Sequence, residues 1–205
     1  MTEEVKIFLN KLNSDFFPIV EQAKKYFDKD SKIREDGAAE IFRRPWVAPV
    51  NYGLWLFPPA VTKLFDKFVE RTNITIPKLY KTLLMELNGC FVYSFSLYGL
   101  PTSLYTTGLL DRSNTQQFDL GTANRNWKNQ YNIDTNLFYI GGRSYSQSEN
   151  IGYFIKENKI LSIRKSGEIL KTWDTILEFL NDEIAISEKQ MLEKVPDDIK
   201  NSWIV

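Results

Sequence analysis

The sequence predicts an α+β fold, in which an antiparallel β-sheet meander packs against helices mainly on one of its faces. Three observations lead to this class. An amphipathic helix ends at Asn88–Gly89 and leads directly into an aromatic segment. In this segment one face of a strand is marked by apolar side chains at every second position. Short apolar runs between residues 137 and 171 are separated by turn residues, which favours antiparallel pairing of neighbours. Helical periodicity returns only after these strands, as in an α+β domain.

The N-terminal part of the chain is expected to contain two short helices and an irregular aromatic segment. Apolar residues recur at helical spacing over residues 2–12, and Ser14 or Asp15 is expected to cap a second helix. The charged run 28–37 is expected to be a loop. Four prolines exclude a long helix from the segment that follows, where a short strand is expected near Gly53–Phe57.

Two helices and one aromatic strand are expected between residues 59 and 98. Pro59 starts the first helix. Pro77 starts the second, because proline fixes φ and lacks an N–H, which suits the first turn of a helix. Gly89 ends that helix, because glycine tolerates the left-handed conformation of a helix stop. The alternating segment Phe91–Tyr98 is expected to form a single strand.

The C-terminal half is expected to contain a weak helix, four short strands and a final helix. The weak helical pattern covers residues 116–130. The strands are expected at residues 137–140, 152–155, 160–164 and 168–171. The polar segment Arg143–Asn150 is expected to be a loop. Thr172 or Asp174 is expected to cap the final helix, which Ile186–Val195 can continue.

The composition excludes several functional classes. The 205 residues include 26 Lys plus Arg and 26 Asp plus Glu, so the chain lacks the excess of basic residues that is typical of nucleic-acid binding. The absence of histidine excludes Ser–His–Asp and Cys–His catalysis and all metal sites that contain histidine. A single cysteine suggests a reducing compartment. We expect a soluble cytoplasmic protein with no membrane span, metal or cofactor.

Three segments resemble conserved parts of one family. The first is IPKLYKTLLMELNG at 76–89, followed by an aromatic strand that ends in LYG. The second is LFYIGG at 137–142, leading to GYFI at 152–155, and the third is KTWDTILEFLNDE at 171–183. In order and spacing they resemble the SUKH superfamily, which includes the yeast Smi/Knr cell-wall-assembly regulators and many bacterial immunity proteins.

The resemblance covers residues 59–184. It leaves residues 1–58 as an N-terminal helical and aromatic extension and residues 185–205 as a C-terminal appendage. The loop Arg143–Asn150 is rich in serine, whereas the family often has Asp–Gly turns there.

The resemblance implies a non-catalytic protein that binds another protein. Bacterial members look like immunity proteins that bind and block a cognate toxin, whereas yeast-type members look like regulatory interaction proteins. We therefore expect a protein-binding module that neutralises a toxin, with a regulatory scaffold of the same fold as the alternative. An enzyme that uses only carboxylates is a third hypothesis, and it requires two carboxylates about 5–10 Å apart in a cleft.

Five residues are candidates for partner binding, because aromatic and arginine side chains are common anchors in protein interfaces. They are Trp46, Tyr52, Arg143, Tyr145 and Glu149. For Trp46 and Tyr52 the sequence favours a structural role, in which they attach the extension to the domain, because large aromatic side chains are mostly buried. No catalytic or metal-binding residue is predicted, and the oligomeric state is left open.

Other polar clusters are interpreted as structural. The acidic residues within 35–40 and the pair Asp197–Asp198 could hold a divalent metal or act as acid and base, but such runs are usually solvated loops. Arg43–Arg44 could bind phosphates, which the zero net charge disfavours. Cys90 is expected to be a small core residue rather than a nucleophile.

Overall fold

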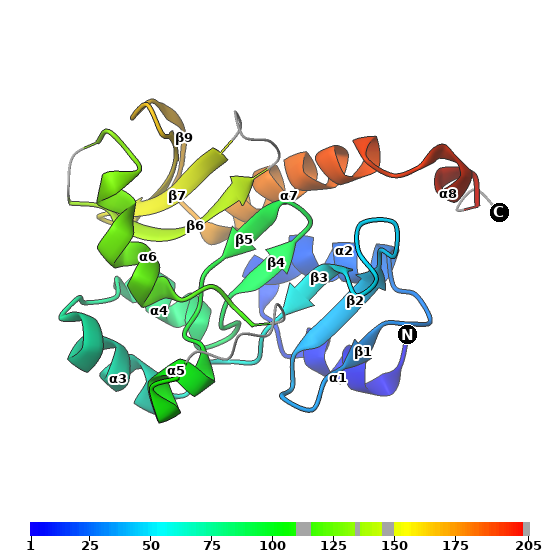
Figure 1. Ribbon diagram of the computed structural model, residues 1–205, viewed down its shortest axis with the longest axis horizontal. Coiled ribbons are helices and arrows are strands. Elements are labelled where there is room, and N and C mark those ends of the chain that lie inside the picture. The colour runs from blue at the N-terminus through cyan, green and yellow to red at the C-terminus, as the bar shows by residue number, and fades with distance from the viewer. Residues whose placement is uncertain (110–115, 134–135, 145–149, 203–205) are drawn as a thin grey trace.

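A computed structural model describes residues 1–109, 116–133, 136–144 and 150–202. These residues form an α+β fold around one nine-stranded sheet, in which every strand pairs antiparallel with the next strand of the chain (Figure 1). The predicted fold class is therefore confirmed. The strands are β1 (Lys32–Ile33), β2 (Ala39–Arg43), β3 (Tyr52–Leu56), β4 (Cys90–Val92), β5 (Phe95–Leu97), β6 (Phe138–Ser144), β7 (Asn150–Lys156), β8 (Lys159–Arg164) and β9 (Ile169–Trp173).

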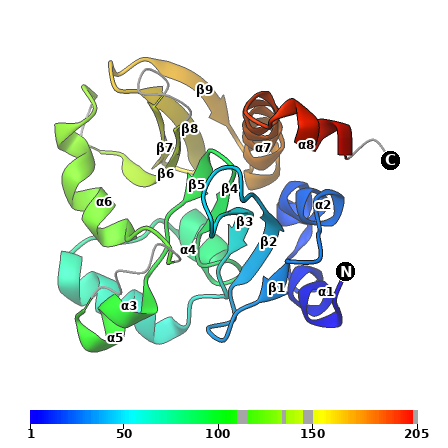
Figure 2. The same ribbon diagram turned by 45° about the vertical axis from the view of Figure 1, so that its right-hand side comes forward.

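Along the chain, helices precede the first strand, connect some of the strands and follow the last strand. They are α1 (Glu3–Asn10), α2 (Phe17–Lys25), α3 (Thr62–Thr72), α4 (Lys78–Leu84), α5 (Thr102–Thr107), α6 (Leu120–Asn126), α7 (Ile176–Glu193) and α8 (Asp197–Ser202), with 3-10 turns η1 (Ser14–Phe16) and η2 (Trp127–Asn129). Figure 2 shows α1, α2 and α7 along one side of the sheet and α6 on the opposite side. In the described part of the chain, no helix is long and apolar enough to cross a membrane.

The main core lies on the inner face of the sheet, which we define as the face toward α7. This core joins residues of α1, α2, α3, α4 and α7 to side chains from strands β2 to β8. A smaller core lies on the outer face, where Trp127 and Tyr131 pack against Tyr139 and Phe154. A Cβ atom on Gly152 would lie 2.6 Å from the hydroxyl oxygen of Tyr131, so glycine is required for this close packing.

Several local signals read from the sequence are confirmed. Pro77 directly precedes α4, as expected. The predicted helix stop at Gly89 is wrong, because α4 already ends at Leu84 with Met85 as its C-cap, and Gly89, with φ of 87°, lies in the connection to β4. The four C-terminal strands are present, each longer than its apolar run. The last helix continues through Ile186 without a break as far as Glu193. Its cap is Thr175 rather than Thr172 or Asp174, which corrects the prediction: the Thr175 side chain accepts a hydrogen bond from the backbone N–H of Glu178.

Other local predictions are wrong. The segment Phe91–Tyr98 does not form one strand, because Tyr93 and Ser94 turn the chain between β4 and β5 and Val92 pairs with Phe95. Tyr93 adopts φ of 58°, which is uncommon for a residue other than glycine. The turn therefore lacks the glycine or asparagine that usually reveals a two-residue hairpin.

The N-terminal segments also differ from expectation. The expected loop 28–37 contains strand β1, and β2 forms where only irregular structure was expected. The side chain of Asn13, rather than Ser14 or Asp15, caps the η1 turn before α2. Strands β1, β2 and β3 join the same sheet as β4, and Ile41 and Leu54 lie in the main core. Residues 1–58 thus contribute directly to the sheet and to its core.

Candidate functional site

The outer face of the sheet differs between its two halves. Directly opposed residues in antiparallel strands share a face, and one such row runs across all nine strands. It consists of Lys32, Glu40, Trp55, Phe91, Ser96, Gly142, Gly152, Ile163 and Ile169. The η2 turn and the end of α6 cover this row over β6 to β8. Over β3 to β5, none of the described helices covers the row, and the outer face forms the floor of a groove.

This groove has a volume of about 730 Å³, which lies within the range of roughly 300–1,000 Å³ that is typical of ligand pockets. One side is the β2–β3 connection with β3, which supplies Arg44, Asn51 and Trp55. The floor is the β4–β5 hairpin, and the opposite side is the segment 116–119 before α6. The groove therefore joins segments that are far apart in the sequence.

Aromatic rings line the groove. The ring of Phe91 lies between two others, with centroids 6.0 Å from Trp55 and 4.9 Å from Phe118, both in edge-to-face geometry. Phe91 is partly exposed, and Phe118 is 53% exposed. Val50 adds another apolar side chain to the lining and is 69% exposed. Exposed apolar groups gathered at one groove are typical of an interaction site.

Arg44 provides the positive charge of the groove. Its Nε donates to the side-chain oxygen of Asn51 at 3.1 Å, and its Nη2 donates to the backbone oxygen of Tyr52 at 3.1 Å. Its guanidinium lies over the ring of Tyr93, 5.8 Å from the centroid. Burial lowers the pKa of Arg44 below its ordinary value. Among the described residues, no carboxylate forms an ion pair with it.

Two further polar groups line the groove, and they differ in how well they are satisfied. Trp55 is 8% exposed, and its indole N–H has no hydrogen-bond partner among the described residues. Asp119 is fully engaged, because its carboxylate accepts from the backbone N–H groups of Gly121 and Thr122 and from the Tyr105 hydroxyl. Asp119 thus serves as the cap of α6, whereas the buried Trp55 N–H is unpaired within the described part of the chain.

Tyr52 is among the residues that line the groove, whereas Trp46 is not. Tyr52 is 9% exposed, its hydroxyl donates to the backbone oxygen of Asp30 at 3.3 Å, and it lines the groove. Burial raises its pKa. Trp46 is partly buried and packs edge-on against Phe42, with ring centroids 5.9 Å apart. Both aromatic residues therefore contact other parts of residues 1–58 and help to fix the β2–β3 connection.

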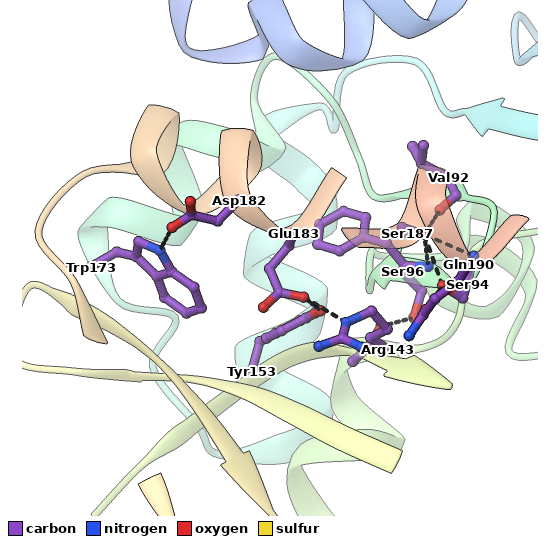
Figure 3. A network of polar contacts seen from close by, with 12 residues as sticks. Val92, Ser94, Ser96, Arg143, Tyr153, Trp173, Asp182, Glu183, Ser187 and Gln190 are labelled. Atoms are coloured by element: carbon purple, nitrogen blue, oxygen red, sulfur yellow. Dashed lines mark hydrogen bonds and ion pairs between the residues drawn. The ribbon is translucent and has the colours of Figure 1, made fainter. Parts of the chain in front are cut away.

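Arg143 does not lie in a loop, which corrects the sequence prediction. It lies within β6, is 8% exposed and points to the inner face, where its Nε donates to Glu183 on α7 at 2.7 Å (Figure 3). The Tyr153 hydroxyl donates to the same carboxylate oxygen at 2.5 Å. Burial, with the negative charge of Glu183, raises the pKa of Tyr153 well above its usual value. Tyr145 and Glu149 lie outside the described residues.

The remaining polar candidates have structural surroundings. Glu40 is not in a solvated loop as expected, because it is 4% exposed in β2, with Lys32 and Arg34 nitrogens each 3.6 Å from its carboxylate. Cys90 is fully buried, and burial raises its pKa to about 12, which confirms the core assignment. Within the described ranges, no group of three or more Cys, Asp or Glu side chains could hold a metal ion.

Sequence reasoning missed most of this groove. Arg44 was considered only as a phosphate ligand, and Phe91 only as one residue of a long strand. Phe118 lies 27 positions after Phe91, on a segment expected to be helical, so no local pattern connects the two rings. Comparison with models of protein families and with curated proteins finds no match to this chain.

Proposed function

We propose that this protein is a non-catalytic protein-binding module, most simply a cytoplasmic immunity protein that neutralises a cognate bacterial toxin by covering it. The resemblance of the sequence to the SUKH superfamily suggests this class. The observation that carries the proposal is the groove on the outer face, which combines an uncovered aromatic sheet surface with one arginine. Aromatic and arginine side chains are the usual anchors of protein interfaces.

The exposure of the groove supports binding of a macromolecule. Val50 and Phe118 are 69% and 53% exposed although both are large and apolar. They line an open groove rather than a closed cavity that would surround a small substrate. A partner that buries both side chains would gain about 25 cal/mol for each Å² of apolar area removed from water. An exposed apolar surface of this kind is typical of a protein interface.

The groove is poorly equipped for acid–base chemistry. Among the described residues that line it, Asp119 is the single carboxylate, and its oxygens are occupied by the cap of α6. General acid–base hydrolysis of sugars requires two available carboxylates. This arrangement favours binding over the carboxylate-only enzyme hypothesis. A regulatory scaffold would use the same groove, and the identity of the partner distinguishes it from an immunity protein.

The experiment is affinity capture from a lysate of the source cells, with the purified full chain immobilised and bound proteins identified by mass spectrometry. We expect one stoichiometric partner that carries a C-terminal toxin domain. Phe118→Ser should reduce its capture at least about tenfold, because an exposed anchor is lost. Val61→Ser is the matched control, because Val61 is 63% exposed but lies at the start of α3, away from the groove.

Two results would contradict the proposal. Capture that is unaffected by Phe118→Ser would show that the partner binds another surface. A set of weakly bound host proteins without a toxin domain would replace the immunity function by the regulatory one.

A further inference from the structure

We infer that Arg44 is the receptor for a carboxylate of the partner, so that the groove binds a protein segment in which Asp or Glu neighbours an apolar side chain. This inference rests on the proposed function, since it supplies the chemistry of the partner. It is carried by charge complementarity: the groove contains a partly buried cation with which no carboxylate of the described residues forms an ion pair.

Arg44 differs from the other arginines that the structure describes. Arg34, Arg43, Arg143 and Arg164 each form an ion pair with a carboxylate. Arg71 and Arg125 are exposed, so water can solvate them. Arg44 is partly buried and bonded only to neutral oxygens. A cation that is removed from water without an ionic partner is costly, and an incoming carboxylate would offset that cost.

The geometry of Arg44 leaves donors for such a ligand. Nε and one Nη2 hydrogen are used by Asn51 and Tyr52, whereas Nη1 makes no hydrogen bond to the described residues. A guanidinium has five N–H donors in a rigid plane, and two adjacent donors match the spacing of carboxylate oxygens. Its existing bonds and the ring of Tyr93 hold this plane in position, so little entropy is lost on binding.

The surroundings of Arg44 favour a protein segment over other anions. Phe91, Phe118 and Val50 line the same groove and require an apolar partner. The ring of Trp55 lines the groove as well, whereas its indole N–H is buried and has no hydrogen-bond partner among the described residues. A nucleic acid would require several cations along its phosphates, whereas the described lining contains Arg44 as its single cation, together with the anion Asp119.

The test uses the full-length protein labelled with nitrogen-15 and two synthetic tripeptides, acetyl-Phe-Glu-Phe-amide and acetyl-Phe-Gln-Phe-amide. Proton–nitrogen correlation spectra resolve the Nε–H of Arg44 and the indole N–H of Trp55, assigned from Arg44→Gln and Trp55→Phe spectra. We expect the glutamate peptide to shift both signals and to bind about tenfold more tightly than the glutamine peptide. Arg44→Gln should abolish this preference.

Three further variants separate the effect of the Arg44 charge from effects on the rest of the groove and on folding. Arg43→Gln removes the neighbouring arginine, which is exposed and paired with Asp30, and should leave peptide affinity unchanged. Phe118→Ala leaves Arg44 intact and should weaken both peptides. If Arg44→Gln disturbs the β2–β3 connection, Arg44→Lys preserves the charge but not the planar pair of donors and should lose most of the preference. Dispersed spectra report whether each variant is folded.

Three results would overturn the inference: equal affinity for the two peptides, binding that is insensitive to Arg44, or equally tight binding of acetate, which would reveal a simple anion site.

Failure of the proposed function gives a different result from failure of this inference. Peptide binding through Arg44 without any captured protein would contradict the protein-binding role, and capture that survives Arg44→Gln would contradict the inference alone. Loss of both peptide preference and partner capture in Arg44→Gln would support both.

Discussion

The Nε atom of Arg143 on β6 lies 2.7 Å from Oε2 of Glu183 on α7, and this ion pair is almost completely removed from solvent. The side chains are 9% and 3% exposed. The hydroxyl of Tyr153 on β7 donates to the same oxygen (Figure 3). Because the three groups satisfy one another, they attach α7 to the sheet, and Arg143 is not available to a partner.

We therefore expect Arg143→Ala to lower the free energy of unfolding by about 3–5 kcal/mol, because it leaves the Glu183 carboxylate buried without its cation. Urea denaturation followed by circular dichroism measures this loss. Arg164→Ala is the control: the pair of Arg164 with Glu168 is more than half exposed, so its loss should cost less than about 1 kcal/mol. A comparable small effect for Arg143→Ala would refute the structural role.

Ser187 on α7 is expected to be a second attachment point. Its hydroxyl donates to the backbone oxygen of Val92 and accepts from the backbone N–H groups of Ser94 and Phe95, at 2.8 to 3.1 Å. Ser187→Ala should cost about 2 kcal/mol, because it leaves buried backbone groups of the β4–β5 turn unsatisfied. Ser166→Ala, at an exposed turn, should be nearly neutral in the same urea experiment. Equal stabilities of the two variants would contradict this explanation.

The contacts of Ser187 explain why part of the fold could not be predicted. The strands β6 to β9 were predictable because the sequence between them consists of polar or glycine residues. The β4–β5 turn has no such mark, and aromatic alternation continues through Tyr93. Its stabilising partner lies more than 90 positions away on α7. A positive φ at Tyr93 is therefore maintained by tertiary contacts rather than by local sequence preference.

The candidate site was less predictable than the fold, for a related reason. Tyr52 could be selected because aromatic residues concentrate near it in the sequence. The significance of Arg44 depends on the finding that no carboxylate in the described ranges forms an ion pair with it, and a sequence does not show this. Arg143 was misassigned because its ionic partner Glu183 is 40 positions away on another element. Polar residues near a predicted loop can equally belong to a buried pair.

The two tryptophans Trp55 and Trp173 allow a direct test of the unpaired donor. They are 8% and 4% exposed, and Trp173 donates its indole N–H to a carboxylate oxygen of Asp182 at 2.5 Å, whereas Trp55 finds no acceptor among the residues that the structure describes. Trp173→Phe should cost about 1.5–3 kcal/mol more than Trp55→Phe, because a hydrogen bond to a charged group is lost only in the former. Urea unfolding of both variants measures the difference. A larger loss in Trp55→Phe would imply a partner for its indole.

Buried cysteine and tyrosine side chains with raised pKa values predict that the free energy of unfolding falls at alkaline pH. Burial raises the pKa of Cys90 from 9.0 to about 12 and raises those of Tyr80 and Tyr153 well above 10.0. The unfolded chain therefore releases these protons at a lower pH than the folded chain. Folding stability is fully present below about pH 9 and is lost as the pH rises toward the folded pKa values, because the folded state binds more protons in this interval.

Cys90→Ala isolates one contribution to this loss. Between about pH 9 and pH 10, an unfolded thiol is mostly ionised and the buried thiol is not, so the free energy of unfolding should fall by up to about 1.4 kcal/mol per pH unit for this group. The variant should show a shallower decline over the same interval, even if its stability near neutrality is lower. Urea titrations at several pH values measure both slopes, and parallel slopes would show that the Cys90 thiol ionises equally in both states.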